Sequence, residues 1–185
     1  MNVIGITGTL GAGKGTIVDL LKDEYSYEHY SVRDYLVEVI RERGLEVNRD
    51  SMTMVANELR ANNSPSFITD ELYKKAVKNN INCIIESIRT PGEIESLRAK
   101  GEFYLFAVDA DSKIRYHRIQ IRKSSTDNVD YETFVANEER EMNTDDPNKQ
   151  NLAKCISMAD FVFNNNGDLS ELNTKIREVI NNISK

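Results

Sequence analysis

The sequence lacks tryptophan, and it contains only two cysteines among 185 residues. No apolar run approaches the roughly 20 residues that a membrane-spanning helix needs, and the N-terminus lacks a signal-peptide pattern. We therefore expect a cytoplasmic protein that has no membrane partner. Cys83 and Cys155 show no metal-ligand spacing, which favours buried free thiols over a disulfide or a metal site.

Positive charge is also scarce, because 24 Lys and Arg residues stand against 30 Asp and Glu residues, for a formal net charge of -6. Broad, non-specific binding of nucleic acid requires clustered positive charge. The eight tyrosines are scattered rather than set in a basic groove. We therefore expect no nucleic-acid partner, although local basic sites for phosphate remain open.

Short apolar runs alternate with amphipathic stretches of helix length, which is typical of an α/β domain with a mainly parallel sheet. The pattern predicts strands at 2–7, 27–31, 82–88, 103–109 and 160–164. It predicts helices at 14–24, 33–43, 51–62, 68–79, 91–100, 112–123, 131–142 and 169–183. Strands that are apolar on both faces require helices on both sides. We expect one three-layer α/β/α domain over residues 1–185, with a five-stranded sheet and charged insertions at about 33–80 and 123–148.

The strongest motif is a glycine-rich loop between the first predicted strand and the first predicted helix. Its residues are Gly8, Thr9, Leu10, Gly11, Ala12, Gly13, Lys14, Gly15 and Thr16. Glycines allow successive backbone N–H groups to point at a phosphate, and the helix N-terminus adds partial positive charge. Lys14 would reach the β- and γ-phosphates. The motif in this order predicts a P-loop that binds ATP.

The loop departs from the common Gly-Lys-Ser/Thr ending, because Gly15 occupies the hydroxyl position and Thr16 follows. This Gly-Lys-Gly-Thr ending resembles the adenylate-kinase-like nucleoside and deoxynucleoside monophosphate kinases, to which dephospho-CoA kinase is related. The resemblance implies a P-loop NTPase fold, ATP and Mg²⁺ as cofactors, an acceptor-binding arm and a lid. Mg²⁺ is then expected to be held largely through water and substrate phosphates, with Thr16 nearby.

The segment around Asp34 resembles the start of the acceptor-binding arm in these kinases. Asp34 matches the family's aspartate, whereas Arg33 replaces the preceding glycine. The family's arginine three residues further on is replaced by Val37, so Arg33 or Arg41 is expected to contact the acceptor. Arg60, in the middle of the arm, is a further candidate for acceptor binding.

The segment from Glu86 to Arg89 resembles the run in which the family places an acid and an arginine after a strand. Glu86 ends an apolar strand, where an acid can organise Mg²⁺-bound water. Arg89 matches the arginine that grips the acceptor's phosphate, a task suited to a bidentate guanidinium. A carboxylate paired with a lysine at the sheet edge is the alternative for Glu86.

The predicted helix 112–123 carries Arg115, Arg118 and Arg122 on one face. The resemblance implies that this helix leads into a lid whose arginines neutralise the transferring phosphoryl group. Arg118 and Arg122 are the preferred residues for this role. Arg140 is a second candidate, although its acidic neighbours are also typical of surface pairing, and the whole stripe could be a solvated basic face.

The strand and loop around Asn164 and Gly167 resemble the region that passes beside the adenine of ATP in these kinases. Asn164 or Asn166 with Gly167 would line the purine. An ordinary strand-to-helix turn with Asp168 as N-cap is the alternative.

These residues together predict an ATP-dependent kinase that phosphorylates a nucleoside or deoxynucleoside monophosphate. Lys14, Arg89, Arg118 and Arg122 would align the phosphates and neutralise charge. The alternative is dephospho-CoA kinase, in which Asp34 would act as general base toward a ribose hydroxyl. A non-catalytic ATP-binding regulator is a third reading. The acceptor's base and sugar, the closure of the lid and the oligomeric state are left open by the sequence.

Overall fold

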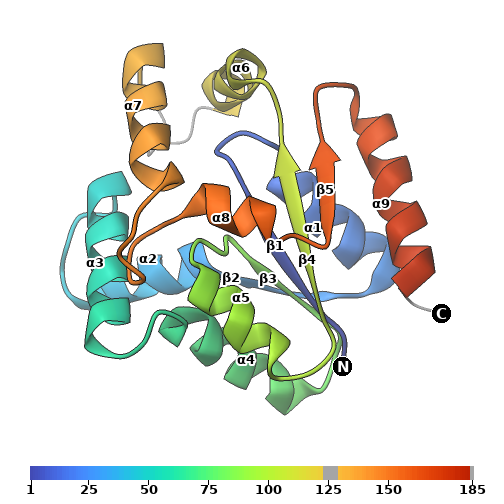
Figure 1. The fold of residues 1–185 in the computed structure, drawn as a ribbon, viewed down its shortest axis with the longest axis horizontal. Helices are drawn as coiled ribbons and strands as arrows, with labels where there is room; N and C mark the ends of the chain where they lie inside the picture. Colours follow the sequence, from blue (N-terminus) through green and yellow to red (C-terminus); the bar gives the residue numbers. More distant parts are fainter. Residues whose placement is uncertain (123–128, 184–185) are drawn as a thin grey trace.

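The computed structural model describes residues 1–122 and 129–183, and a five-stranded parallel sheet lies at the centre of this part (Figure 1). The strands are β1 (Val3–Gly8), β2 (Glu28–Ser31), β3 (Cys83–Glu86), β4 (Phe103–Asp109) and β5 (Phe161–Asn164). Their order in the sheet is β2-β3-β1-β4-β5, and every pairing is parallel. The predicted three-layer α/β/α fold with a mainly parallel sheet is therefore confirmed.

Helices cover both faces of the sheet because the strands are apolar on both faces. Ile4 and Ile6 of β1 pack in the cluster formed with α1 (Lys14–Tyr25) and α9 (Leu169–Ile183). The strand residues that alternate with these, such as Val3, point to the other face of the sheet and belong to a second cluster. The helices that contribute to the second cluster are α2 (Val32–Glu42), α3 (Arg49–Asn62), α4 (Phe67–Asn79), α5 (Pro91–Arg98) and α8 (Leu152–Ser157).

The carboxyl ends of the strands face α6 (Ser112–Arg122) and α7 (Tyr131–Met142), and α3 lies beside them (Figure 1). In the arm, the side chains of Ser31 and Asn48 cap α2 and α3 by accepting hydrogen bonds from backbone N–H groups of the first turn. These caps start the two helices one and two residues earlier than predicted. Residues 123–128 of the predicted lid lie outside the described part of the chain.

The largest change from the predicted strands occurs at β3, which ends at Glu86 rather than at residue 88. Ser87 has a φ of 73°, a left-handed conformation that turns the chain out of the sheet. The backbone N–H groups of Ser87 and Ile88 then both donate to the carbonyl of Ile6, at 3.0 and 3.1 Å. This turn leaves Glu86 as the last strand residue, beside the P-loop.

Two further predictions can be compared with the fold. Cys83 and Cys155 are buried free thiols, as predicted, and burial raises the pKa of each to about 12. Cys155 lies in helix α8, as predicted, but no bounds were predicted for this helix, because six residues are too few to show a helical period. None of the helices in the described residues is both long enough and apolar enough to cross a membrane.

Candidate active site

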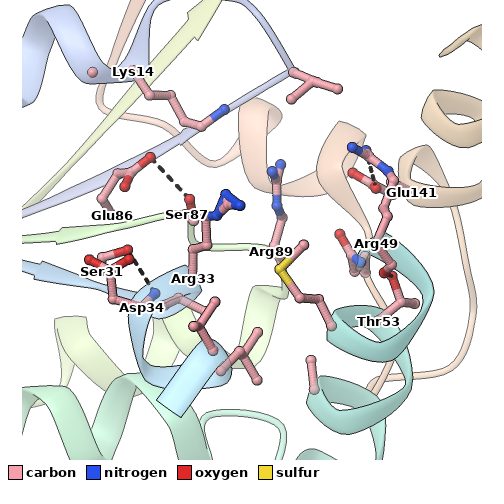
Figure 2. A pocket seen from close by; sticks show the side chains of 18 of the residues that line it. Lys14, Ser31, Arg33, Asp34, Arg49, Thr53, Glu86, Ser87, Arg89 and Glu141 are labelled. Atoms are coloured by element: carbon pink, nitrogen blue, oxygen red, sulfur yellow. Dashed lines mark hydrogen bonds and ion pairs between the residues drawn. The ribbon is translucent and has the colours of Figure 1, made fainter. Parts of the chain in front are cut away.

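A cavity of about 1020 Å³ opens at the carboxyl ends of β1 and β3 (Figure 2). Most of its wall comes from the P-loop, the β2–α2 junction, one face of α3, the turn after β3, and the ends of α6 and α7. This is the edge of a parallel α/β sheet at which ligands commonly bind. The cavity therefore brings together segments that lie far apart in the sequence.

The P-loop is held in shape by a residue that sequence reasoning missed. The side-chain amide of Asn165 donates to the carbonyl of Ala12 at 2.8 Å, and Asn165 is 2% exposed. Gly13 has a φ of 110°, and a Cβ there would lie 2.4 Å from the Asn165 amide nitrogen. The loop after β5 therefore holds the P-loop in place through the side chain of Asn165, and not through Asn164 or Gly167, which were the predicted residues.

Arg115 is a second anchor of the P-loop and does not line the cavity. Its guanidinium donates to the carbonyls of Ala110 and Leu10, at 2.7 and 3.3 Å, and pairs with Glu138 of α7. It is 4% exposed. Arg115 therefore joins the P-loop to α6 and α7, which suits a structural role rather than contact with a phosphate.

Lys14 and Arg89 converge on the same backbone oxygen. Lys14 Nζ donates to the carbonyls of Gly8 and Thr9, at 3.0 and 2.9 Å, and Arg89 Nη1 donates to that of Gly8 at 3.0 Å. Burial, followed by the charge of Arg89, lowers the pKa of Lys14 from 10.5 to about 7. Neither basic side chain forms an ion pair with a carboxylate among the described residues, so the two together form a site that favours an anion.

Glu86 also lines the cavity, on the same side as Lys14 (Figure 2). Ser87 Oγ donates to it at 3.0 Å, and His29 Nε2 lies 3.5 Å from its second oxygen. Burial acts to raise the pKa of Glu86, but the contact with His29 and the charge of Lys14 outweigh burial and lower it. Glu86 is therefore an ionised carboxylate at the mouth of the P-loop.

The donor set fits a phosphate-bound Mg²⁺ better than a protein cage. No group of three or more His, Cys, Asp or Glu side chains in residues 1–122 and 129–183 could hold a metal ion. Thr16 and Glu86 both line the cavity, and Gly15 has no heavy atom within 4 Å of its would-be Cβ. Mg²⁺ is commonly bound by one or two carboxylates with substrate phosphates and water, which is what these residues could complete.

Of the predicted lid arginines, Arg118 and Arg122 line the cavity. Arg118 Nη2 donates to the backbone carbonyl of Asn165 at 2.9 Å, which ties it to the P-loop anchor. The charge of Arg122 contributes to the lowered pKa of Lys14. These two side chains therefore extend the cationic surface from the P-loop toward α6.

The arm supplies a second wall that has an apolar middle. Arg33, Asp34 and Arg41 of α2 line it, and Arg49 and Arg60 stand at the two ends of the facing stripe of α3. The same wall also contains Val37, Val47, Met52, Thr53 and Ala56. The wall thus combines an apolar surface with cations at its edges.

Six predicted site residues are absent from the described wall of the cavity: Gly8, Thr9 and Ala12 of the P-loop, and Arg140, Asn164 and Gly167. Arg140 instead pairs with Asp50 on the surface, at 3.3 Å. Asn164 and Gly167 are exposed, and their contact with adenine stays a prediction.

The sequence held no signal for the partly buried ion pair between Arg49 and Glu141, at 2.5 Å, which joins α3 to the end of α7 (Figure 2). Both partners lie in runs of charged residues, where a buried pair cannot be told from exposed ones. Glu141 is 7% exposed and lines the cavity. The arm and α7 are therefore joined directly across the cavity.

A family model described as AAA domain matches residues 4–144 of the chain. The chain belongs to this family. The AAA-domain chain is also similar to UPF0200 proteins of archaea. The one from Methanococcus maripaludis strain C6 is 29% identical over 98% of this chain and 99% of its own length. That from Methanocaldococcus jannaschii is 27% identical over 100% and 94%.

Solved structures show the same fold at low identity. Shikimate kinase from Bacteroides thetaiotaomicron has a TM-score of 0.61 and 14% identity, covering 97% of this chain and 98% of its own. A gluconokinase from Sinorhizobium meliloti 1021 has a TM-score of 0.54 and 10% identity, covering 99% and 95%. The AAA-domain chain therefore has the fold of P-loop kinases, as predicted.

Proposed function

We propose that the protein transfers a phosphoryl group from ATP to a nucleoside or deoxynucleoside monophosphate. The convergence of Lys14 and Arg89 on the carbonyl of Gly8 carries this proposal. One cation comes from the P-loop and the other from the turn after β3. An anion held between them would touch both the ATP side and the acceptor side of the cavity.

The mechanism follows from charge and alignment. The phosphate oxygen of a monophosphate acceptor is already anionic at neutral pH, so the reaction needs no strong general base. Lys14 would hold the β- and γ-phosphates, while Arg89 would hold the acceptor's phosphate in line with them. Arg118 and Arg122 would neutralise the charge that spreads over the transferring group. Bound Mg²⁺ would supply further charge neutralisation, with Glu86 and Thr16 positioned toward it.

The arm supports an acceptor that has both an apolar body and a negative charge. Val37, Met52 and Ala56 offer a surface on which a base could pack. Arg33 and Arg41 stand at the edge of that surface, within reach of an anionic group. A mononucleotide combines a flat, weakly polar ring with a phosphate, which suits this distribution better than a uniformly polar acceptor does.

A second candidate is a kinase for a hydroxyl acceptor, with dephospho-CoA kinase as the specific form. Asp34 lines the cavity and is exposed, and its carboxylate has no hydrogen-bond or ion-pair partner among the described residues. A free carboxylate can accept the proton of an attacking hydroxyl. The names of the structural neighbours, a shikimate kinase and a gluconokinase, add weight to this candidate.

The test is ADP formation from ATP and Mg²⁺ in the presence of a panel of ribo- and deoxyribonucleoside monophosphates and dephospho-CoA. Stimulation by one or a few monophosphates supports the proposal, and stimulation by dephospho-CoA alone replaces it with the second candidate. Tight ATP binding without acceptor-stimulated turnover would identify a regulator instead. Lys14→Ala should abolish turnover while leaving the circular dichroism spectrum unchanged.

A further inference from the structure

Arg60 is a buried cation whose hydrogen-bonding capacity is only partly used. It is 1% exposed, and its Nη2 pairs with Glu93 Oε1 at 3.1 Å. Its Nε and Nη1 have no hydrogen-bond partner among the described residues. Buried N–H groups without an acceptor cost free energy, so native proteins seldom leave a guanidinium in this state.

Arg60 is also one of the residues that line the cavity, beside the arm. Arg60 lines the cavity on the same helical face as Ala56 and Thr53, four and seven residues earlier. Ala56 offers no side-chain acceptor, and neither Thr53 nor Asn57 of this helix forms a hydrogen bond with the guanidinium. A ligand that lies against this face of α3 is therefore the natural source of the missing acceptor.

The partner of Arg60 decides which part of a ligand it can recognise. Glu93 is 0% exposed and already compensates the positive charge of Arg60. A charge-compensated pair with spare N–H donors suits an uncharged acceptor, such as a carbonyl oxygen or a ring nitrogen, better than it suits a phosphate. The cations with no carboxylate partner at the P-loop suit the phosphate instead.

Glu93 also connects Arg60 to the proposed transfer site. Its Oε2 accepts hydrogen bonds from the backbone N–H groups of Arg89 and Thr90, at 2.7 and 3.0 Å. Arg60, Glu93 and Arg89 thus form one continuous network from the arm to the P-loop carbonyl of Gly8. Glu93 is a positioning residue for Arg89, and Arg60 holds Glu93 in place.

We infer that Arg60 is a specificity-determining residue that binds the uncharged, hydrogen-bond-accepting edge of the acceptor's base. The inference rests on the proposed function, because it assumes an acceptor that carries a base. It divides recognition of that acceptor between two sites. Arg89 and Lys14 bind the phosphate, and Arg60 binds the base at the other end of the acceptor.

The test compares Arg60→Lys with a matched control, Arg43→Lys. Lysine keeps a charge for Glu93 but loses the donors at Nε and Nη1. Arg43 also forms an ion pair with a residue of α3, Glu58, at 2.9 Å, but that pair is partly exposed and does not line the cavity. The probes are AMP, CMP, GMP and UMP, together with ribose 5-phosphate, which has the phosphate and sugar without a base. Dissociation constants are measured by calorimetry.

We expect wild-type protein to bind at least one of the monophosphates more tightly than ribose 5-phosphate. Arg60→Lys should weaken that monophosphate by about 10- to 100-fold, leave ribose 5-phosphate unchanged, and differ from Arg43→Lys, which should match wild type. Equal weakening of both probes, or no weakening, would overturn the inference. So would a wild-type protein that does not prefer any monophosphate, a comparison that does not depend on the folding of a variant.

The binding measurements test the role of Arg60, whereas ADP formation tests the proposed reaction, so the two can fail separately. If the expected binding pattern is found but no monophosphate stimulates ADP formation, the proposed reaction fails and the role of Arg60 stands. If a monophosphate is phosphorylated but Arg60→Lys binds it as well as wild type does, the reaction stands and the role of Arg60 fails.

Discussion

Replacement of Gly13 by alanine tests the account of how the P-loop is held. Gly13 has a φ of 110°, and the added Cβ would lie 2.4 Å from Asn165 Nδ2. The left-handed backbone costs a residue with a side chain about 1–3 kcal/mol. Displacing the Asn165 amide from the Ala12 carbonyl would leave buried polar groups unpaired, at a further cost of about 1–3 kcal/mol.

The two costs sum to about 2–6 kcal/mol, which is a large part of the 5–15 kcal/mol that stabilises a typical domain. The matched control is Gly15→Ala, because Gly15 has no atom within 4 Å of its would-be Cβ and no positive φ. That variant should be neutral or gain about 0.4–1 kcal/mol through a less flexible unfolded chain. Equilibrium urea denaturation of both variants gives the comparison, and equal midpoints at equal m-values would refute the reasoning.

A double-mutant cycle separates the clash from the backbone strain. Asn165→Ala alone should destabilise the protein, because it removes the bond to the Ala12 carbonyl. In that background Gly13→Ala should cost only the backbone strain, since the amide it would strike is gone. Strict additivity of the two substitutions would show that Asn165 is not the group that Gly13 must avoid.

Three other predictions concern charges in the cavity. The pKa of Lys14 falls from 10.5 to about 7 on folding, so the unfolded chain binds more protons between these values. The free energy of unfolding should therefore rise with pH across this window, and Lys14→Met should remove the rise. A bound anion reverses the shift, so ATP binding at pH 8 should take up a proton, detected by calorimetry in buffers of different ionisation enthalpy. Glu141→Gln should lower the free energy of unfolding by about 1–3 kcal/mol, because it removes the carboxylate charge from the bond with the partly exposed Arg49, whereas Glu139→Gln, at an exposed position of the same helix, should change it by less than about 0.5 kcal/mol. Similar unfolding curves for these two variants would contradict the buried pair.

Much of the fold could be predicted because its signals are local. The alternation of apolar runs with helical periods gave the five strands and eight of the helices, with most boundaries within two residues. Thr90 caps α5 and Asp168 holds the first turn of α9, as their residue types predict. The end of β3 could not be predicted, because nothing in its apolar sequence announces that Ser87 takes a left-handed conformation.

The candidate site also contains residues that the sequence predicts and residues whose role only the structure shows. The P-loop, Glu86 and Arg89 were predicted from motifs whose spacing carries the chemistry, and all of them lie at one cavity. Arg115 and Arg118 stand on neighbouring turns of α6, and sequence spacing alone could not assign them different roles. Arg115 turned out to be buried against the P-loop, because its guanidinium meets Leu10 and Glu138.

The sequence by itself determined the parallel α/β architecture, the phosphate loop and the chemical types gathered around it, because these depend on residues close together in the chain. Only the tertiary structure decided which of many arginines face the cavity and which are held elsewhere. Asn165 reaches Ala12, Arg49 reaches Glu141, and Arg60 reaches Glu93 across separations that no local pattern encodes. The physical reason is that a charged or amide side chain has the same sequence signature whether it is solvated or buried, and only packing supplies or withholds its partner.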